Sequence, residues 1–121
     1  MHIRVDQQGN SKVAIVENDG LLIQDVQDAL DLMATVRYQE ECDKIILYKS
    51  NMTEVFFDLS TKLAGEILQK YMNYQLKIAI VGDYSGYTSK SLRDFIYECN
   101  QGSQVFFVAD EQAALEALHR S

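Results

Sequence analysis

Three side chains that could react or be modified lie close together in the stretch FFDLSTKLAGEILQKY, which spans residues 56–71. Asp58, Ser60 and Thr61 follow a short apolar run, IILYKS, and precede a segment with helical periodicity. A hydroxyl beside an acid can be a phosphorylation site, where the added charge changes the pairing with a partner. The same residue types are preferred helix caps, because a side-chain oxygen accepts a hydrogen bond from an unpaired backbone N–H group.

Capping is the simpler of these two interpretations. We expect Asp58 or Ser60 to cap a helix that runs to about Tyr74, since such a cap is expected at the start of any helix. No histidine lies in or near the segment, so no base is available to turn Ser60 into a nucleophile. Lys62 completes the group of candidate regulatory or partner-binding residues, which are Asp58, Ser60, Thr61 and Lys62.

A second hydroxyl-rich stretch, GDYSGYTSKSLRDF, spans residues 82–95. A helix beginning between Tyr87 and Ser91 could hold an anion with its free N–H groups. The spacing matches neither Gly-x-x-x-x-Gly-Lys-Ser/Thr nor Gly-x-Gly-x-x-Gly, the two common phosphate-binding patterns. We therefore favour a turn over residues 83–86 and a hydroxyl cap for the helix. The candidate anion-binding residues are Ser85, Thr88, Ser89 and Lys90.

Other reactive residue types are scattered along the chain. Neither Cys42 nor Cys99 has an adjacent histidine or basic residue, so packing is favoured over nucleophilic chemistry. His2 and His119 lie near the ends of the sequence and are expected to be solvated. We expect no Ser-His-Asp constellation, and the two histidines and two cysteines make a poor metal set. The sequence thus predicts neither a catalytic set nor a metal or cofactor.

Composition narrows the class of protein further. A chain of 121 residues with 47% hydrophobic and 24% charged residues is typical of one globular domain, here residues 1–121. The net charge of −7 argues against nucleic acid or anionic membrane as partners, since both attract clustered lysine and arginine. No leader peptide and no apolar run of bilayer length are recognisable, so we expect the cytoplasm, with reduced cysteines.

Hydrophobic periodicity predicts the order of the elements. Short apolar runs alternate with segments whose apolar residues have helical spacing, which indicates an α/β fold. We expect a single domain with five strands in a mostly parallel sheet and four helices, in the order β-β-α-β-α-β-α-β-α. Right-handed crossovers place the carboxyl ends of parallel strands at one edge, so both hydroxyl-rich loops should lie there together. Expected strands are 2–8, 12–17, 44–49, 76–83 and 104–110, and expected helices begin near residues 24, 59, 87–91 and 111.

The same periods predict the core. Alternate strand residues should be buried beneath the apolar faces of the helices. We expect buried strand positions at Ile45, Leu47, Ile78, Ile80, Val105 and Phe107, packed under Leu30, Leu63, Ile67 and Ile96.

The runs DVQDALDLMATVRYQEECDKIIL, FFDLSTKLAGEILQKYMNYQLKIAIVGDYS and YTSKSLRDFIYECNQG resemble the bacterial family called domain of unknown function 4180. The resemblance covers nearly the whole chain, but the family has no established activity and implies no reaction. More distantly, the layout resembles STAS domains, which are named for sulphate transporters and anti-sigma-factor antagonists. In those domains an Asp-Ser-Ser-Gly or Asp-Ser-Thr-Gly motif follows the third strand, and a partner kinase phosphorylates its serine in the antagonist branch.

This resemblance implies two registers for the motif, and both stay open. In the first, Asp58 is the acid, Leu59 stands where a hydroxyl is usual, and Ser60 is the phosphorylated position. Thr61 then replaces the glycine. In the second, which aligns the downstream helix, Ser60 matches the acid, Thr61 the first hydroxyl and Lys62 the phosphorylated serine.

These observations lead to an expected role. We expect a non-enzymatic, cytoplasmic regulatory or protein-interaction module, STAS-like in layout, whose protein partner docks on residues 49–61 and 83–91. Neither nucleic acid nor membrane is an expected partner, and the sequence leaves a homodimer open. The alternative is a small anionic-ligand-binding protein or enzyme that uses residues 82–93 and the helix N-terminus.

Overall fold

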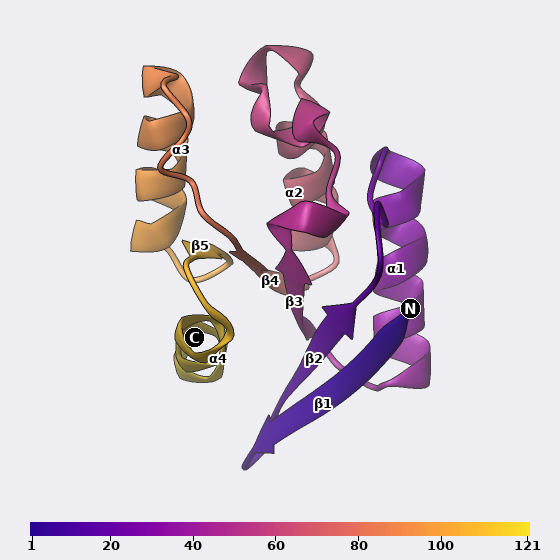
Figure 1. Cartoon of the computed structure of the whole chain (residues 1–121). Helices are drawn as coiled ribbons and strands as arrows, with labels where there is room; N and C mark the ends of the chain where they lie inside the picture. The colour runs from indigo at the N-terminus through magenta and orange to yellow at the C-terminus, as the bar shows by residue number, and fades with distance from the viewer.

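A five-stranded sheet forms the centre of the computed structural model, which describes all residues 1–121 (Figure 1). The strands lie side by side in chain order, with β1 antiparallel to β2 and every later pair parallel. The predicted α/β fold with a mostly parallel sheet is confirmed. The strands are β1 (His2–Gln8), β2 (Ser11–Glu17), β3 (Lys44–Tyr48), β4 (Lys77–Val81) and β5 (Val105–Val108).

Helices cover both faces of this sheet, as expected for a parallel arrangement (Figure 1). Three helices share the larger core on one face, and α4 packs alone on the other. No helix has the length and apolar character needed to cross a membrane. The helices are α1 (Val26–Gln39), α2 (Leu63–Asn73), α3 (Lys90–Gln101) and α4 (Glu111–Arg120), and three short 3-10 turns are η1 (Lys49–Asn51), η2 (Glu54–Phe57) and η3 (Leu59–Thr61).

Alternation along the strands divides the apolar residues between two cores. On β3, Ile45 and Leu47 face the larger core, while Ile46 faces α4. All six strand positions expected in the core are buried, and so is Ile67 of α2. The other three helix positions, Leu30, Leu63 and Ile96, are partly buried against the same cluster. The core prediction is therefore confirmed.

The aspartates at the start of α1 have a local structural role. Asp25 accepts a hydrogen bond from the amide of Asp28 at 2.8 Å, and the Asp28 carboxylate accepts one from the amide of Gln24 at 2.9 Å. Asp25 is thus the N-cap of α1, and Asp28 in the first turn binds the amide of the residue that precedes the cap. Both side chains also lie at the positive end of the helix dipole, a position where acidic residues stabilise a helix.

The start of α2 differs from the expectation. Asp58 caps the short turn η3, where its side chain accepts a hydrogen bond from the amide of Ser60 at 3.1 Å. The chain then passes through Lys62 with φ of +68°, and α2 begins at Leu63. The prediction that Asp58 or Ser60 caps the long helix is wrong, because a left-handed residue separates the capped turn from that helix.

His119 also differs from the expectation of a solvated side chain. Its side chain, in the last turn of α4, is only 5% exposed. One ring nitrogen lies 2.7 Å from Asp6 Oδ2 and the other 2.8 Å from Ser11 Oγ. His119 is therefore not solvated, and a Ser-His-Asp row does exist. The fold brings together residues more than 100 positions apart, which no local pattern could indicate.

Ile80 offers a direct test of the core. It is fully buried in the middle of β4, in the cluster shared by α1, α2 and α3. We predict that Ile80→Ala lowers the free energy of unfolding by about 2–5 kcal/mol, through lost transfer energy and the cavity left behind. Chemical denaturation measures this loss. Ile80→Val, which removes one methylene, should cost only about 0.5–1.5 kcal/mol, and equal effects of the two variants would contradict the buried position.

Candidate functional site

Both hydroxyl-rich loops lie at the carboxyl edge of the parallel strands, where they contact each other. We call residues 49–61 and 83–91 the two-loop surface. Phe57 of η2 stacks on Tyr87 with ring centroids 5.5 Å apart, and it also contacts Tyr84 at 6.0 Å. Phe57 is buried and Tyr87 is half-buried, so this aromatic contact joins the two loops on their buried side.

The charged side chain of Lys49 packs over the same two aromatic rings. The ammonium of Lys49 lies 5.0 Å from the centroid of the Tyr87 ring and 5.3 Å from that of Phe57. Lys49 also forms an ion pair with Glu54 at 3.1 Å, and the hydroxyl of Tyr87 donates to Glu54 Oε2 at 2.8 Å. The hydrogen bond from Tyr87, followed by that from Lys49, lowers the pKa of the Glu54 carboxyl. Glu54 is therefore ionised at neutral pH and links the loops as an acceptor.

Gly82 allows this arrangement at the end of β4. A Cβ atom at position 82 would lie 2.6 Å from Cβ of Lys49 and 2.9 Å from its Cδ. Cβ of Lys49 is fixed to the backbone of η1, so it has little freedom to move away. The residue directly after β4 must therefore lack a side chain if Lys49 is to reach across to Tyr87.

The first set of candidate residues, Asp58, Ser60, Thr61 and Lys62, lies at the exposed turn η3. The hydroxyl of Ser60 donates to Asp58 Oδ1 at 2.6 Å, and both residues are exposed. The hydroxyl of Thr61 is within hydrogen-bond distance of two backbone carbonyls, those of Val55 at 3.0 Å and Asp58 at 2.8 Å. Thr61 therefore holds the backbone of the turns together, whereas the hydroxyl of Ser60 is bonded only to a side chain.

The second set lies around the start of α3. The hydroxyl of Ser89 accepts from the amide of Leu92 at 3.2 Å, so Ser89 caps α3, which begins at Lys90 as predicted. Lys90 forms an ion pair with Asp94 at 2.7 Å. The amide of Ser85 donates to the carboxylate of Asp83 at 2.9 Å. Binding of an anion by Ser85, Thr88, Ser89 and Lys90 stays a prediction.

The structure thus brings the two predicted loops together, but through other residues. Their mutual contacts run through Lys49, Glu54, Phe57, Tyr84 and Tyr87. All five lie inside the predicted docking ranges 49–61 and 83–91, although none belongs to the two sets of candidate residues. The available sequence signal was aromatic: one phenylalanine and two tyrosines follow strands that end at the same edge. Such residues are typical of contact surfaces, because they combine an apolar ring with few rotatable bonds.

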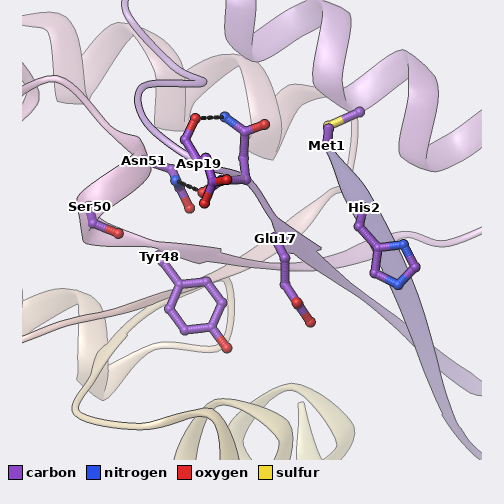
Figure 2. Close-up of a pocket in the computed structure, with 8 residues that line it drawn as sticks. Met1, His2, Glu17, Asp19, Tyr48, Ser50 and Asn51 are labelled. Atoms are coloured by element: carbon purple, nitrogen blue, oxygen red, sulfur yellow. Dashed lines mark hydrogen bonds between the residues drawn. The ribbon is translucent and has the colours of Figure 1, made fainter.

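A polar pocket of about 490 Å³ opens beside this surface, over the ends of β2 and β3 (Figure 2). Figure 2 shows His2, Glu17 and Tyr48 extending from neighbouring strands on the same side of the sheet. Burial, then the hydrogen bond to Glu111, raises the pKa of Tyr48 to about 12, so its hydroxyl is a donor at neutral pH. The lining residues are Met1, His2, Glu17, Asn18, Asp19, Tyr48, Ser50 and Asn51.

Asn51 lines this pocket and also belongs to the two-loop surface, so it connects the two regions. Its side chain is buried, and its amide donates to the carbonyl oxygen of Asn18 at 2.7 Å (Figure 2). The same amide also donates to the carbonyl oxygen of Gly20 at 2.8 Å. The loop after β2 is therefore fixed to the loop after β3. A buried amide with both donors satisfied contributes to stability, because loss of the side chain would remove a hydrogen-bond donor from each of two carbonyl groups.

Fold and site together define a small α/β protein whose loops gather at the carboxyl edge of a mostly parallel sheet. Residues 8–118 match the family model described as "Domain of unknown function (DUF4180)", and the chain belongs to this family. No curated protein matches the chain.

Gly82 yields a prediction about the two-loop surface. We expect Gly82→Ala to lower the free energy of unfolding by about 1–3 kcal/mol, because the added methyl group overlaps the fixed Cβ of Lys49. Gly86→Ala is the matched control: a Cβ there meets nothing within 4 Å, so the change in stability should be below about 1 kcal/mol. Urea denaturation compares the two variants, and a neutral Gly82→Ala would contradict the close contact.

Proposed function

We propose that this protein is a regulatory protein-interaction module of the bacterial cytoplasm, STAS-like in layout, whose protein partner docks on the two-loop surface. The observation that carries the proposal is the fastening of the two loops by Lys49, Glu54, Phe57 and Tyr87. A surface whose loops are already ordered binds a partner without the entropic cost of ordering them. The buried polar contacts of Asn51 extend this order to the neighbouring loop.

The exposed part of the surface suits a protein partner with basic groups. Val55 is 48% exposed and provides an apolar contact beside the half-buried Leu59. The exposed acidic residues Glu54, Asp58 and Asp83 belong to the same two loops. A small apolar centre with a charged rim is the usual composition of a non-obligate interface. The acidic rim favours lysine and arginine side chains on the partner, since complementary charge steers association.

Phosphorylation of Ser60 is the regulation that we propose for this surface. Between the two hydroxyls of η3, that of Ser60 points to an exposed side chain, while that of Thr61 bonds to backbone carbonyls. A phosphate on Ser60 would replace the hydrogen bond to Asp58 with repulsion between like charges. The added negative charge would alter the surface without disturbing the buried residues Phe56 and Phe57 below it.

The experiment first identifies the partner by proximity. A photo-crosslinking amino acid replaces Val55 in the native cell, and the same substitution at Tyr38, which is 81% exposed on α1, serves as the control. We expect one protein to be cross-linked from position 55 and not from position 38. Mass spectrometry of the purified chain, with and without phosphatase, then determines the occupancy of phosphate on Ser60.

Binding of the identified partner tests the role of charge. We predict that Ser60→Asp changes the dissociation constant at least about tenfold, a free-energy difference of about 1.4 kcal/mol. Ser103→Asp makes the same chemical change at an exposed site before β5, at the opposite edge of the sheet, and should leave binding unchanged. Isothermal titration calorimetry measures both. Equal affinities for wild type and Ser60→Asp, or cross-links that do not depend on position, would contradict the proposal.

A further inference from the structure

Four polar side chains form a continuous row at the edge of the sheet opposite to the two-loop surface. Lys44 Nζ lies 2.8 Å from Ser11 Oγ, which lies 2.8 Å from His119 Nδ1. The other ring nitrogen, Nε2, lies 2.7 Å from Asp6 Oδ2. Ser11 and Lys44 are the first residues of β2 and β3, Asp6 belongs to β1, and His119 lies in the last turn of α4.

Hydrogen-bond directions along this row follow from the chemistry of its ends. An ammonium can only donate, so Ser11 Oγ accepts from Lys44. An ionised carboxylate can only accept, so His119 donates to Asp6 through Nε2. Neutral imidazole then has a free lone pair on Nδ1, which accepts the hydroxyl proton of Ser11. The serine hydroxyl is thus directed at a base whose tautomer is fixed by an acid, which is the functional geometry of a catalytic triad.

We propose that Ser11 is the nucleophile of an acyl-transfer site, with His119 as general base and Asp6 as positioning residue. Ser11 Oγ attacks the carbonyl carbon of an ester, and its proton passes to His119 Nδ1. The C–O bond to the leaving alcohol then breaks, and the alcohol takes that proton from His119. Water attacks the acyl-serine by the same route in reverse, which releases the carboxylic acid and restores the serine.

Lys44 provides the electrostatic part of this site. Its side chain is largely buried, and its ammonium already contacts the reacting oxygen at 2.8 Å. The tetrahedral intermediate carries a negative oxygen on the carbon next to Ser11 Oγ. A fixed positive group in a poorly solvated position stabilises such charge more than water does. Burial also lowers the pKa of Lys44, in keeping with its removal from solvent.

Space for a small substrate lies next to the row. A pocket of about 360 Å³ has Asp6, Gln8 and His119 in its wall. Gln8 is the direct cross-strand partner of Ser11, so the pocket borders the strand pair that carries the nucleophile. Ser11 itself is half-buried at the start of β2, immediately after the hairpin turn. The size of the pocket suits esters of short acyl groups, and the inference is independent of the function proposed for the two-loop surface.

The test uses a fluorophosphonate probe on the full chain. The serine oxygen displaces fluoride from phosphorus, and mass spectrometry identifies the modified residue. We expect modification at Ser11 and none at the exposed Ser60, together with slow hydrolysis of p-nitrophenyl acetate that Ser11→Ala abolishes. His119→Ala should slow modification by about 100-fold or more, and added imidazole should partly restore the rate. Restoration by imidazole is not expected of a residue whose role is only structural.

A matched control comes from the other end of α4. Glu111 accepts from Tyr48 at 2.8 Å and from Arg4 at 2.7 Å, so Glu111→Gln loosens the same helix without touching the row. This variant should react like wild type. Asp6→Asn, a conservative change at a partly exposed site, should slow modification at least about tenfold and replaces His119→Ala as the test if that variant does not fold. An unmodified Ser11 in the folded wild type, or a rate that is unchanged in Asp6→Asn, would overturn the proposal.

Discussion

Parallel pairing of β3 with β4 is the constraint on which the candidate site depends. The pairing runs from Lys44 opposite Lys77 to Tyr48 opposite Val81, so both strands end at the same level. The next residue on each chain segment, Lys49 and Gly82, must then share the space directly above the sheet. They do so because Gly82 has no side chain, and the lysine can extend over the aromatic rings of the neighbouring loop.

The face of the sheet that α4 covers combines a small apolar core with polar contacts at both ends of the helix. Here α4 packs alone over a core of seven buried residues, which is much smaller than the 23-residue core on the other face. Polar contacts hold both of its ends: Glu111 in the first turn bonds to Arg4 and Tyr48, and His119 in the last turn bonds to Asp6 and Ser11. All of these partners except Tyr48 lie on the hairpin formed by β1 and β2. The hairpin therefore contributes to this face in two ways: Val13 and Ile15 of β2 belong to the small core, and polar side chains of both strands bond to the ends of α4.

Local patterns were sufficient for the strands and for the core. The alternation of Ile45, Ile46 and Leu47 between two faces follows directly from the period of a strand. The start of α2 could not be predicted in this way, because Asp58 is a good cap for a 3-10 turn as well as for a helix, and the left-handed Lys62 has no sequence signal. The family was recognised from long blocks of sequence, and the match over residues 8–118 confirms it.

Contacts between side chains far apart in the sequence were beyond such patterns. His119 is separated from Asp6 by 113 positions, and its burial depends on how α4 docks against the hairpin. Likewise, Glu54 and Tyr87 meet only because two strand ends are level, although each residue alone looks like part of a solvated loop. Polar contacts of this kind are not visible in the hydrophobic periodicity of a sequence. The fold can therefore be predicted from that periodicity, while much of the site cannot.

A double-mutant cycle on Glu54 and Tyr87 tests most directly whether the two loops form one surface. The variants are Glu54→Gln, Tyr87→Phe and the double variant, with free energies of unfolding measured by urea denaturation at neutral pH. The hydroxyl of Tyr87 donates to ionised Glu54 at 2.8 Å, so we expect a coupling energy of about 0.5–1.5 kcal/mol. Additive effects, with a coupling energy near zero, would mean that the loops are independent in solution and would contradict a single two-loop surface.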